Sequence, residues 1–363
     1  MKEKTKNAVV TIGFVTILFI SLIMSIVKED ETISLSERRK LAQFPVITME
    51  SVRNGEASEK FEEYAVDQFI SRDDLRSVKA FLSKNIFMKK DNNGLFLKDN
   101  SIYKIEYPLN VANVQKSTDK IYKVYEKYLQ GMNMYYAIVP DKNYYLKADY
   151  LKIDVTRLNE IMQNRLIQMK YIDLIDTLEL SDYYRTDLHW KQERLTKVIN
   201  FIEKEMELKD TSNIAYQRKD MGDFYGTYYG QLGMNIPPDK ISILTNNTID
   251  NATTYNYETK TSGKVYDEEK WRTSSDKYDI YLSGPAAVID IENPYGPKGK
   301  ELLLFRDSFG SSIAPLLLEN YQKITLIDLR YISSEILDEY INFENQDVLF
   351  LYSTLVLNQN VIK

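Results

Sequence analysis

The chain contains no cysteine among its 363 residues. This absence excludes a thiol nucleophile, a disulfide framework and thiolate-bound zinc or iron–sulfur sites. Histidine occurs once, at His189, so the usual multi-histidine metal sites are excluded as well. A metal would have to be held by carboxylates alone, and no D-x-D-x-D-G loop supports such a site. We therefore predict neither a metal ion nor a cofactor.

A strong excess of positive charge is also missing. The formal net charge is −6, and acidic and basic residues are mixed along the chain. Nucleic-acid binding proteins usually carry a basic stripe or patch, and none is seen here. The charge pattern predicts that the chain has no nucleic-acid partner.

Residues 8–27 contain no charged side chain and are long enough, as a helix of about 30 Å, to cross a lipid bilayer. Lys2, Lys4 and Lys6 precede this run, and acidic residues follow it at positions 29–31. Such a lysine bias predicts a cytoplasmic N-terminus and an extracytoplasmic body. A cleaved signal peptide is the alternative, but the run is long and its end lacks an A-x-A-like site. We interpret it as a single-pass anchor in the cell membrane.

Patterning divides the chain into three parts. Residues 1–30 hold a cytoplasmic stub and the anchor, and residues 31–95 form a linker and a segment with helical spacing of apolar residues. Residues 96–363 form the main domain, with a polar insertion at about 210–285. The N-terminal segment is thus expected to be rich in α-helix.

Short apolar runs alternate with helical patterns through the main domain. The runs are rich in Val, Ile and Leu and lie at 135–140, 286–291, 301–305, 323–329 and 347–352. Helical patterns separate the last of these, at 313–321 and 334–343. Strands that are buried on both faces and alternate with helices indicate an α/β fold, with a mostly parallel sheet covered on both sides.

The stretch RDSFGSS follows directly on the apolar run ELLLF, which places Ser308 at or just beyond the end of a strand. Reactive groups of α/β proteins collect at such carboxyl ends. A serine between a strand and a helix is well placed to be a nucleophile, and nearby backbone N–H groups can face a developing oxyanion. A plain strand-to-helix turn with capping serines is the alternative for this segment alone.

The stretch TDLHW adds Asp187 and His189 to this serine. In an extended segment, side chains two residues apart project to the same side, so the carboxylate can hold one ring nitrogen while the other accepts a proton. This interpretation requires TDLHW to lie outside a helix. The alternative is a histidine that packs beside Trp190 with a satisfied hydrogen bond.

TDLHW followed downstream by RDSFG resembles the DHHW protein family, and through it the alginate O-acetyltransferase branch of the SGNH-hydrolase-like proteins. Further similar stretches are ERRKLAQFP, AVDQFISRDDLR, AIVPDKNYY, IDLR and VLFLY. The resemblance implies a flavodoxin-like α/β fold and transfer of an acyl group, usually acetyl, to an exported polysaccharide. A membrane-bound O-acyltransferase commonly supplies that acetyl group, so the resemblance implies both partners for this chain.

The same resemblance implies that Ser308 is the nucleophile, His189 the general base and Asp187 the carboxylate that orients it. Two residues depart from the family pattern. Leu188 replaces the first His of DHHW, which leaves the outer residues intact. Arg306 stands where related motifs have Gly, and it could narrow the approach to Ser308 or supply a cation beside it.

The residues that would bind the oxyanion or the substrate are less well defined. The backbone N–H groups of Phe309 and Gly310 are candidates, together with the side chains of Arg306, Arg330 and Tyr352. For Arg330 and Tyr352, a structural ion pair and a core tyrosine are equal alternatives.

Three functions remain open. The first is a membrane-anchored extracytoplasmic O-acyltransferase, and the second is a carbohydrate acetyl esterase with the same triad, because the two differ only in whether a sugar or water attacks the acyl-enzyme. The third is a non-catalytic component of a polysaccharide export or modification complex, which binds glycan through its aromatic residues or acts as a scaffold that docks a membrane partner. The distance between His189 and Ser308 distinguishes the third from the first two.

Overall fold

The computed structural model describes residues 3–34, 37, 39–147, 150–234 and 236–363. The chain divides into two compact units. The N-terminal unit comprises residues 1–93 together with 229–235, and the α/β unit comprises residues 94–228 and 236–363. Each unit is described by itself below.

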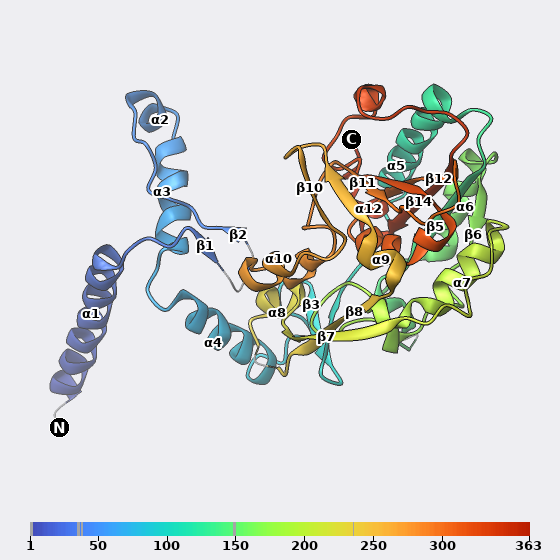
Figure 1. Ribbon diagram of the computed structural model, residues 1–363. Coiled ribbons are helices and arrows are strands. Elements are labelled where there is room, and N and C mark those ends of the chain that lie inside the picture. The colour runs from blue at the N-terminus through green and yellow to red at the C-terminus, as the bar shows by residue number, and fades with distance from the viewer. Residues whose placement is uncertain (1–2, 35–36, 38, 148–149, 235) are drawn as a thin grey trace. The chain divides into compact units, whose positions relative to one another are not determined.

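The N-terminal unit begins with α1, Glu3–Val27, a helix that is long and apolar enough to cross a membrane and has no buried residue. It continues with β1 (Ile33–Ser34) and β2 (Arg39–Lys40), which pair antiparallel, and with the helices α2 (Met49–Arg53), α3 (Glu56–Asp67) and α4 (Arg72–Asn85). The expected apolar helix and the α-rich segment after it are thus confirmed (Figure 1).

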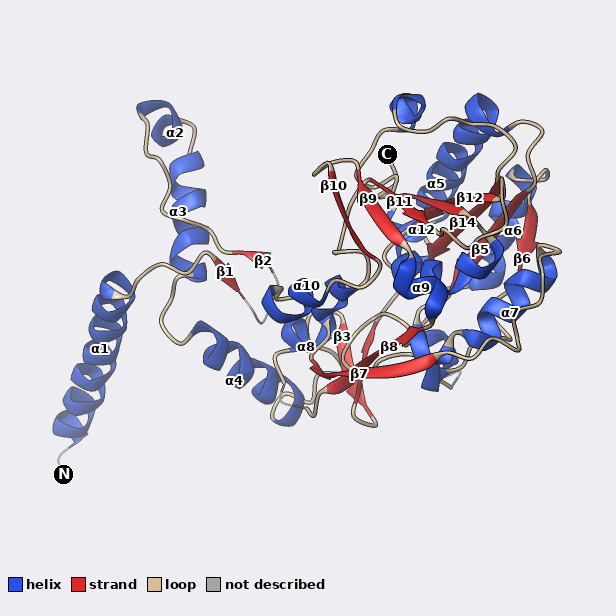
Figure 2. Ribbon diagram, viewed as in Figure 1, coloured by secondary structure: helices blue, strands red, loops and turns tan. Residues whose placement is uncertain are grey.

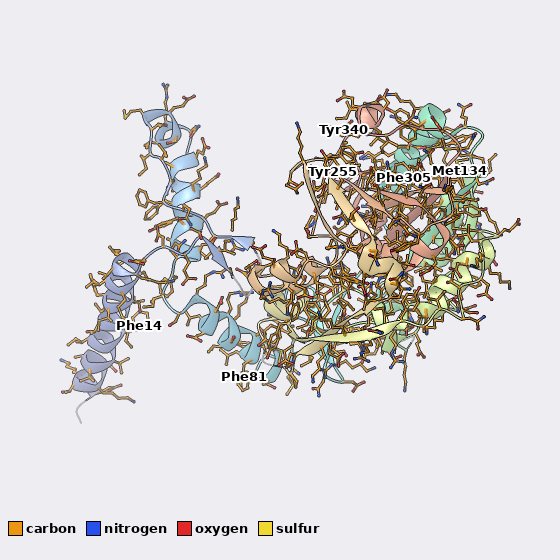
Figure 3. The ribbon with its side chains drawn as sticks, viewed as in Figure 1. Phe14, Phe81, Met134, Tyr255, Phe305 and Tyr340 are labelled. Carbon is orange, nitrogen blue, oxygen red and sulfur yellow. The ribbon has the colours of Figure 1, made fainter. Side chains whose placement is uncertain are left out.

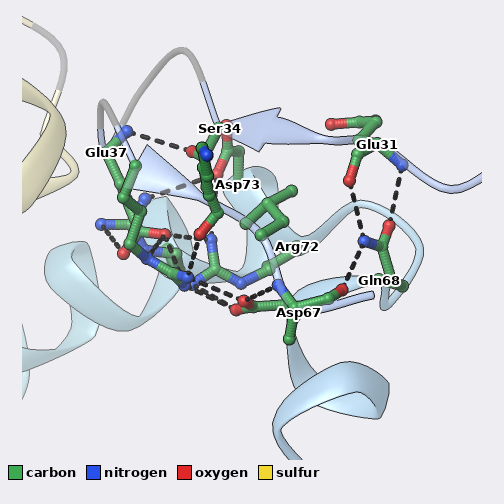
Figure 4. Close-up of polar contacts among 12 residues, drawn as sticks. Glu31, Ser34, Glu37, Asp67, Gln68, Arg72 and Asp73 are labelled. Carbon is green, nitrogen blue, oxygen red and sulfur yellow. Dashed lines mark hydrogen bonds and ion pairs between the residues drawn. The ribbon is translucent and has the colours of Figure 1, made fainter. Parts of the chain in front are cut away.

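A polar network holds β2 to the ends of α3 and α4 (Figure 4). The guanidinium of Arg39 donates to both carboxylate oxygens of Asp67, at 2.7 and 2.5 Å. Arg72 lies 2.6 Å from the carboxylate of Glu37. The Arg39 side chain is the main reason that the pKa of Asp67 is lowered, to about 2. The stretches ERRKLAQFP and AVDQFISRDDLR therefore pair with each other through their charged residues.

The α/β unit is built on a central sheet (Figure 2). Among the described residues this sheet has eight strands, in the order β10-β9-β11-β13-β12-β14-β5-β6. The strands are β5 (Met134–Val139), β6 (Lys170–Ile172), β9 (Thr253–Asn256), β10 (Thr261–Lys264), β11 (Val288–Glu292), β12 (Glu301–Arg306), β13 (Lys323–Ile327) and β14 (Asp347–Ser353). From β13 to β6 all neighbours are parallel, whereas β11, β9 and β10 extend the sheet with antiparallel pairs.

Alternate residues of the central strands enter two separate cores. Leu302 and Leu304 of β12 pack on one face, with α7 (Thr196–Glu205), and Leu303 and Phe305 pack on the other. The second face is covered by α5 (Val111–Val124), α6 (Val155–Arg165) and α12 (Thr354–Gln359). Strands with two buried faces are the reason for their nearly continuous apolar sequences. The expected α/β class and the mostly parallel sheet with helices on both faces are confirmed.

Further elements are two hairpins and several short helices. Two hairpins are formed by β3 (Leu95–Lys98) with β4 (Ser101–Lys104) and by β7 (Gln217–Phe224) with β8 (Asp239–Thr245). The short helices are α9 (Asn247–Asn251), α10 (Glu268–Thr273) and α11 (Phe309–Ile313), together with α8 (Thr227–Leu232), whose residues from Tyr229 onward belong to the N-terminal unit. The helical patterns near 313–321 and 334–343 form 3₁₀ helices, Ala314–Asn320 and Ser334–Glu339, rather than long α-helices. Pro315 lacks an N–H for an α-helical ladder, which explains the first of these.

Candidate active site

Ser308 lies two residues beyond the end of β12, with backbone angles that begin α11. The preceding Asp307 fixes this turn, because its carboxylate accepts hydrogen bonds from the N–H of Phe309 at 3.0 Å and from the N–H of Ser353 at 2.8 Å. The second bond ties the turn to the end of the neighbouring strand β14. Gly310 is required for its small size, since a Cβ there would lie 2.5 Å from the Cβ of Arg306. The RDSFG sequence thus presents Ser308 at a rigid strand end.

TDLHW forms a bend outside any helix, as the interpretation of its two side chains requires. The Oδ1 atom of Asp187 accepts from the backbone N–H of His189 at 2.9 Å and lies 2.5 Å from the ring nitrogen Nδ1. Its Oδ2 atom accepts from the backbone N–H of Thr227 at 2.6 Å. Both oxygens of this fully buried carboxylate are therefore engaged in holding it in place.

The other ring nitrogen of His189, Nε2, lies 2.7 Å from the Oγ atom of Ser308. A carboxylate can only accept hydrogen bonds, so Nδ1 carries the proton toward Asp187 and Nε2 is the acceptor for the Ser308 hydroxyl. The three side chains are thus brought together in the order carboxylate, imidazole, hydroxyl. This is the geometry by which a serine is activated as a nucleophile.

Aromatic rings fix the plane of the imidazole. The His189 ring stacks on Tyr278, with centroids 3.9 Å apart and planes within 9°, and the Phe309 ring lies 4.9 Å away. The Tyr278 hydroxyl donates to the Ser312 Oγ atom at 2.8 Å, and Trp190 donates to the same atom at 2.9 Å. Trp190 thus donates its hydrogen bond to Ser312 and is not a hydrogen-bond partner of the His189 ring. Neither Tyr278 nor Thr227 carries a sequence signal that would have identified it.

A buried lysine holds the segment that carries Asp187. Lys142 is 1% exposed, and its Nζ atom donates to the backbone carbonyls of Tyr184 at 2.7 Å, Arg185 at 3.0 Å and Asp187 at 2.7 Å. Burial lowers the pKa of Lys142 to about 8. From the other side, Asp239 accepts from the backbone and the hydroxyl of Thr186, both at 2.7 Å. The sequence AIVPDKNYY resembles the family, but no local pattern in it predicts this role for its lysine.

A cavity of about 220 Å³ opens beside the Ser308 hydroxyl. Its lining includes His189, Ser308, Thr227, Arg306, Arg330 and Tyr331. Ser308 itself is partly exposed, whereas His189 is only 5% exposed. The volume suits a small acyl group and the end of an acceptor better than a large ligand.

The residues predicted to bind the oxyanion or the substrate differ in whether their hydrogen-bond donors are already occupied. The N–H groups of Phe309 and Gly310 already donate to Asp307, to its carboxylate and its carbonyl respectively. Arg306 lines the cavity and is 1% exposed, and its Nε and Nη2 atoms have no hydrogen-bond partner in the described part of the chain. Within this group, Arg306 therefore offers the donors that are left to receive a negative oxygen.

Arg330 also lines the cavity, but its guanidinium is bound to Asp328 at 2.9 and 2.6 Å. This ion pair is the first cause that raises its pKa, against the opposing effect of burial. Tyr352 is buried, does not belong to the cavity lining, and has a hydroxyl without a partner in the described residues. The structure brings Arg330 to the cavity and leaves Tyr352 outside its lining.

Comparisons with known proteins agree with the motifs. Residues 161–327, which include the three residues at the centre of the site, match the family of DHHW proteins. A DHHW family protein from Eubacterium siraeum DSM 15702 is 21% identical to the chain, with a TM-score of 0.60 over 75% of this chain and 95% of that one. Bacillus cereus PatB1 is 20% identical, with a TM-score of 0.57 over 75% and 99%. Its structure with a sulfonyl adduct is 19% identical, with a TM-score of 0.57 over 74% and 98%.

These matches confirm the resemblance to the DHHW family and the fold that it implies, an SGNH-hydrolase-like sheet with helices on both faces. At this level of sequence identity, the solved structures show only that the fold is shared. Comparison with curated proteins gives no match.

Proposed function

Since the chain is similar to the DHHW protein family, we propose that it is a membrane-anchored, extracytoplasmic O-acyltransferase. It would transfer an acyl group, acetyl in the simplest case, to a hydroxyl of an exported or cell-surface polysaccharide through an acyl-enzyme. The observation that carries this proposal is the continuous contact from Asp187 through His189 to Ser308, with distances of 2.5 and 2.7 Å.

In the first step, the Ser308 oxygen attacks the carbonyl carbon of the acyl donor while its proton passes to Nε2 of His189. The donor's leaving group then departs with that proton, and the acyl group stays on Ser308. Asp187 stabilises the imidazolium that exists between these two events. In the second step, a sugar hydroxyl gives its proton to Nε2 and attacks the acyl carbon. The bond between the acyl carbon and the Ser308 oxygen then breaks, the proton passes from Nε2 to that oxygen, and the acylated sugar is released.

Both steps pass through a negatively charged carbonyl oxygen. Arg306 is the best placed of the candidate donors, because two of its nitrogens are buried beside the cavity without an acceptor in the described residues. Phe309 and Gly310 would contribute only if their N–H groups left Asp307. Arg330, which is bound to Asp328, would set the position of Arg306 or contact the acceptor. Tyr352 lies outside the cavity lining, so its contribution would be minor.

The acyl donor and the location belong to the same proposal. Helix α1 would anchor the chain in the cell membrane through residues 8–27, with the N-terminus in the cytoplasm and the α/β unit outside. A membrane-bound O-acyltransferase would deliver the acyl group from the cytoplasmic side to Ser308. The cavity volume of about 220 Å³ supports a short acyl chain.

The full chain in detergent, mixed with p-nitrophenyl acetate, tests the acyl-enzyme. Mass spectrometry is expected to find one acetyl group on Ser308, and to find none in the Ser308→Ala and His189→Ala variants. Ser311 lies in the same cavity, so Ser311→Ala is the matched control and is expected to keep the acetyl group. A folded protein that is never acetylated would move the assignment to the non-catalytic, glycan-binding role.

The esterase remains the second candidate, because its acyl-enzyme is the same. Acetylated protein, chased with water alone or with oligosaccharides, distinguishes the two. Faster loss of the acetyl group from Ser308 with appearance of acetylated sugar supports transfer. Release of acetate at one rate in both cases supports the esterase.

A further inference from the structure

Helix α4 has an apolar face that nothing in the described N-terminal unit covers. Leu75, Val78, Leu82 and Ile86 follow at helical spacing and are 52%, 52%, 38% and 61% exposed. We call these four residues the α4 stripe. Phe81 on the same helix is 57% exposed, and Figure 3 labels it together with Phe14 of α1. Exposed apolar faces of this kind mark an interaction surface.

A different face of α4 already has its partner. Arg76 donates from Nη2 to the backbone carbonyl of Gly230 at 2.8 Å, and Ala80 and Ser83 are buried. A Cβ added to Gly233 would lie 3.9 Å from the Cβ of Ala80. The contact with residues 229–234 therefore fixes the rotation of α4 about its axis, and the α4 stripe stays outward.

The start of α4 is tied to the end of α1. The backbone N–H of Ile70, two residues before α4, donates to the Oγ atom of Ser25 in the last turn of α1 at 3.1 Å. Tyr64 donates to Asp30 at 3.0 Å, just beyond the end of α1. Helix α4 therefore begins close to the last turn of α1, which is where α1 would leave a bilayer.

The charges beside the α4 stripe are complementary to a lipid surface. Four exposed lysines, Lys79, Lys84, Lys89 and Lys90, lie on α4 and directly after it, whereas the acidic residues of α4, Asp73 and Asp74, are confined to its first turn. Phe87 and Met88, between these lysines, are 67% and 82% exposed. Amphipathic helices with an apolar stripe and neighbouring lysines lie in the interface of membranes that contain anionic lipids.

We infer that α4 is a second membrane contact, which lies in the outer interface of the bilayer with the α4 stripe among the acyl chains and its lysines at anionic headgroups. This inference rests on the proposed anchoring through α1. With two contacts, the N-terminal unit would be held at a fixed orientation on the membrane instead of swinging from a single helix.

The absence of cysteine allows a direct test with single-cysteine variants of the full chain. Bimane is attached at Val78→Cys or Leu82→Cys, at Ser77→Cys as the matched control on the polar face, and at Phe14→Cys to report on α1. Each protein is reconstituted into phosphatidylcholine–phosphatidylglycerol vesicles that contain lipids with a nitroxide near the headgroup or in the acyl chain. Iodide serves as the aqueous quencher.

Nitroxide lipids are expected to quench the labels at positions 78 and 82 at least about twofold more than the label at 77, with the reverse order for iodide. Quenching of 78 and 82 by iodide as strong as that of 77 overturns the inference. So does protection from both quenchers, which would show that a protein covers the α4 stripe. The Phe14 label separates the two proposals, because its failure to be quenched by lipid would refute anchoring through α1 itself.

Discussion

The buried lysine beside the candidate active site, Lys142, leads to a prediction in which stability and activity change by different amounts. Lys142→Met removes the ammonium while keeping a side chain of similar length. The three carbonyls that it binds belong to the segment that carries Asp187. We expect the acylation rate of Ser308 to fall while the protein stays folded.

The magnitude follows from two opposing effects. The lowered pKa, from 10.5 to about 8, means that keeping Lys142 charged in the fold costs about 3 kcal/mol, at about 1.4 kcal/mol per pH unit. Removing the donor costs about 1–3 kcal/mol for each buried carbonyl left without it. The Arg185 carbonyl also accepts from Ile102, so two carbonyls count, for about 2–6 kcal/mol. The free energy of unfolding should thus fall by no more than about 3 kcal/mol.

The active site is more sensitive, because a carbonyl that turns to find another donor moves the carboxylate of Asp187. A misplacement of about 1 Å costs about 100-fold in rate. The assay is the initial rate of Ser308 acetylation by p-nitrophenyl acetate. Lys170→Met, which removes an exposed lysine that also binds a backbone carbonyl, serves as control and should leave the rate unchanged. A Lys142→Met rate within about threefold of wild type would refute the positioning role.

The lowered pKa of Lys142 also predicts the pH above which activity falls. Above pH 8, Lys142 loses its proton and can no longer donate to three carbonyls, so the acetylation rate should fall. Between pH 8 and 10.5 the unfolded chain holds this proton and the folded chain does not. The titration of Lys142 by itself therefore raises the free energy of unfolding with pH. Loss of rate without a parallel loss of thermal stability is the expected pattern, and a Lys142→Met pH profile of unchanged shape would contradict it.

Three further predictions concern other contacts. Gly226→Ala should abolish Ser308 acetylation, since its Cβ would lie 2.2 Å from the Cβ of Asp187; a normal rate would refute this. Burial raises the pKa of Glu106 to about 8, so it binds a proton in the fold that the unfolded chain releases near pH 4.5, and stability falls as pH rises between these values. Denaturant titrations should show wild type losing on the order of 4 kcal/mol more than Glu106→Gln from pH 5 to 8, and equal losses would contradict the assignment. Asp67→Asn should lower the stability of the N-terminal unit by about 1 kcal/mol at pH 7, after allowance for the exposure of Arg39, and wild type should lose this advantage as pH falls through the pKa of about 2; hydrogen exchange in α3 measures both.

Much of the fold and the centre of the site follow from the sequence. The strands of the parallel part are apolar runs because both of their faces are buried, and a periodicity of this kind depends only on near neighbours in the chain. The Asp187–His189 pair is local too, since its spacing alone puts both side chains on one side of an extended segment. Because His189 is the single histidine of the chain, a serine that it activates must lie next to it in the fold. Ser308 was the natural candidate, since it was expected at the end of a strand.

The tertiary structure decided what surrounds these residues. Tyr278, Thr227 and Lys142 reach His189 and Asp187 from segments far away in the chain, and no local pattern records such contacts. Tertiary contacts also distinguish between the candidates for binding the oxyanion. Asp307 accepts from the N–H groups of Phe309 and Gly310, while packing leaves two buried nitrogens of Arg306, a residue of the cavity lining, without an acceptor in the described residues.

The antiparallel edge of the sheet was likewise set by packing. The apolar run of β11 has the composition of a parallel strand, yet β11 pairs antiparallel with β13 and β9. A strand's sequence records that it is buried and not the direction of the strand beside it. The sequence by itself thus determined which groups are candidates for the reaction, and the packing of distant segments determined which partners hold them in position.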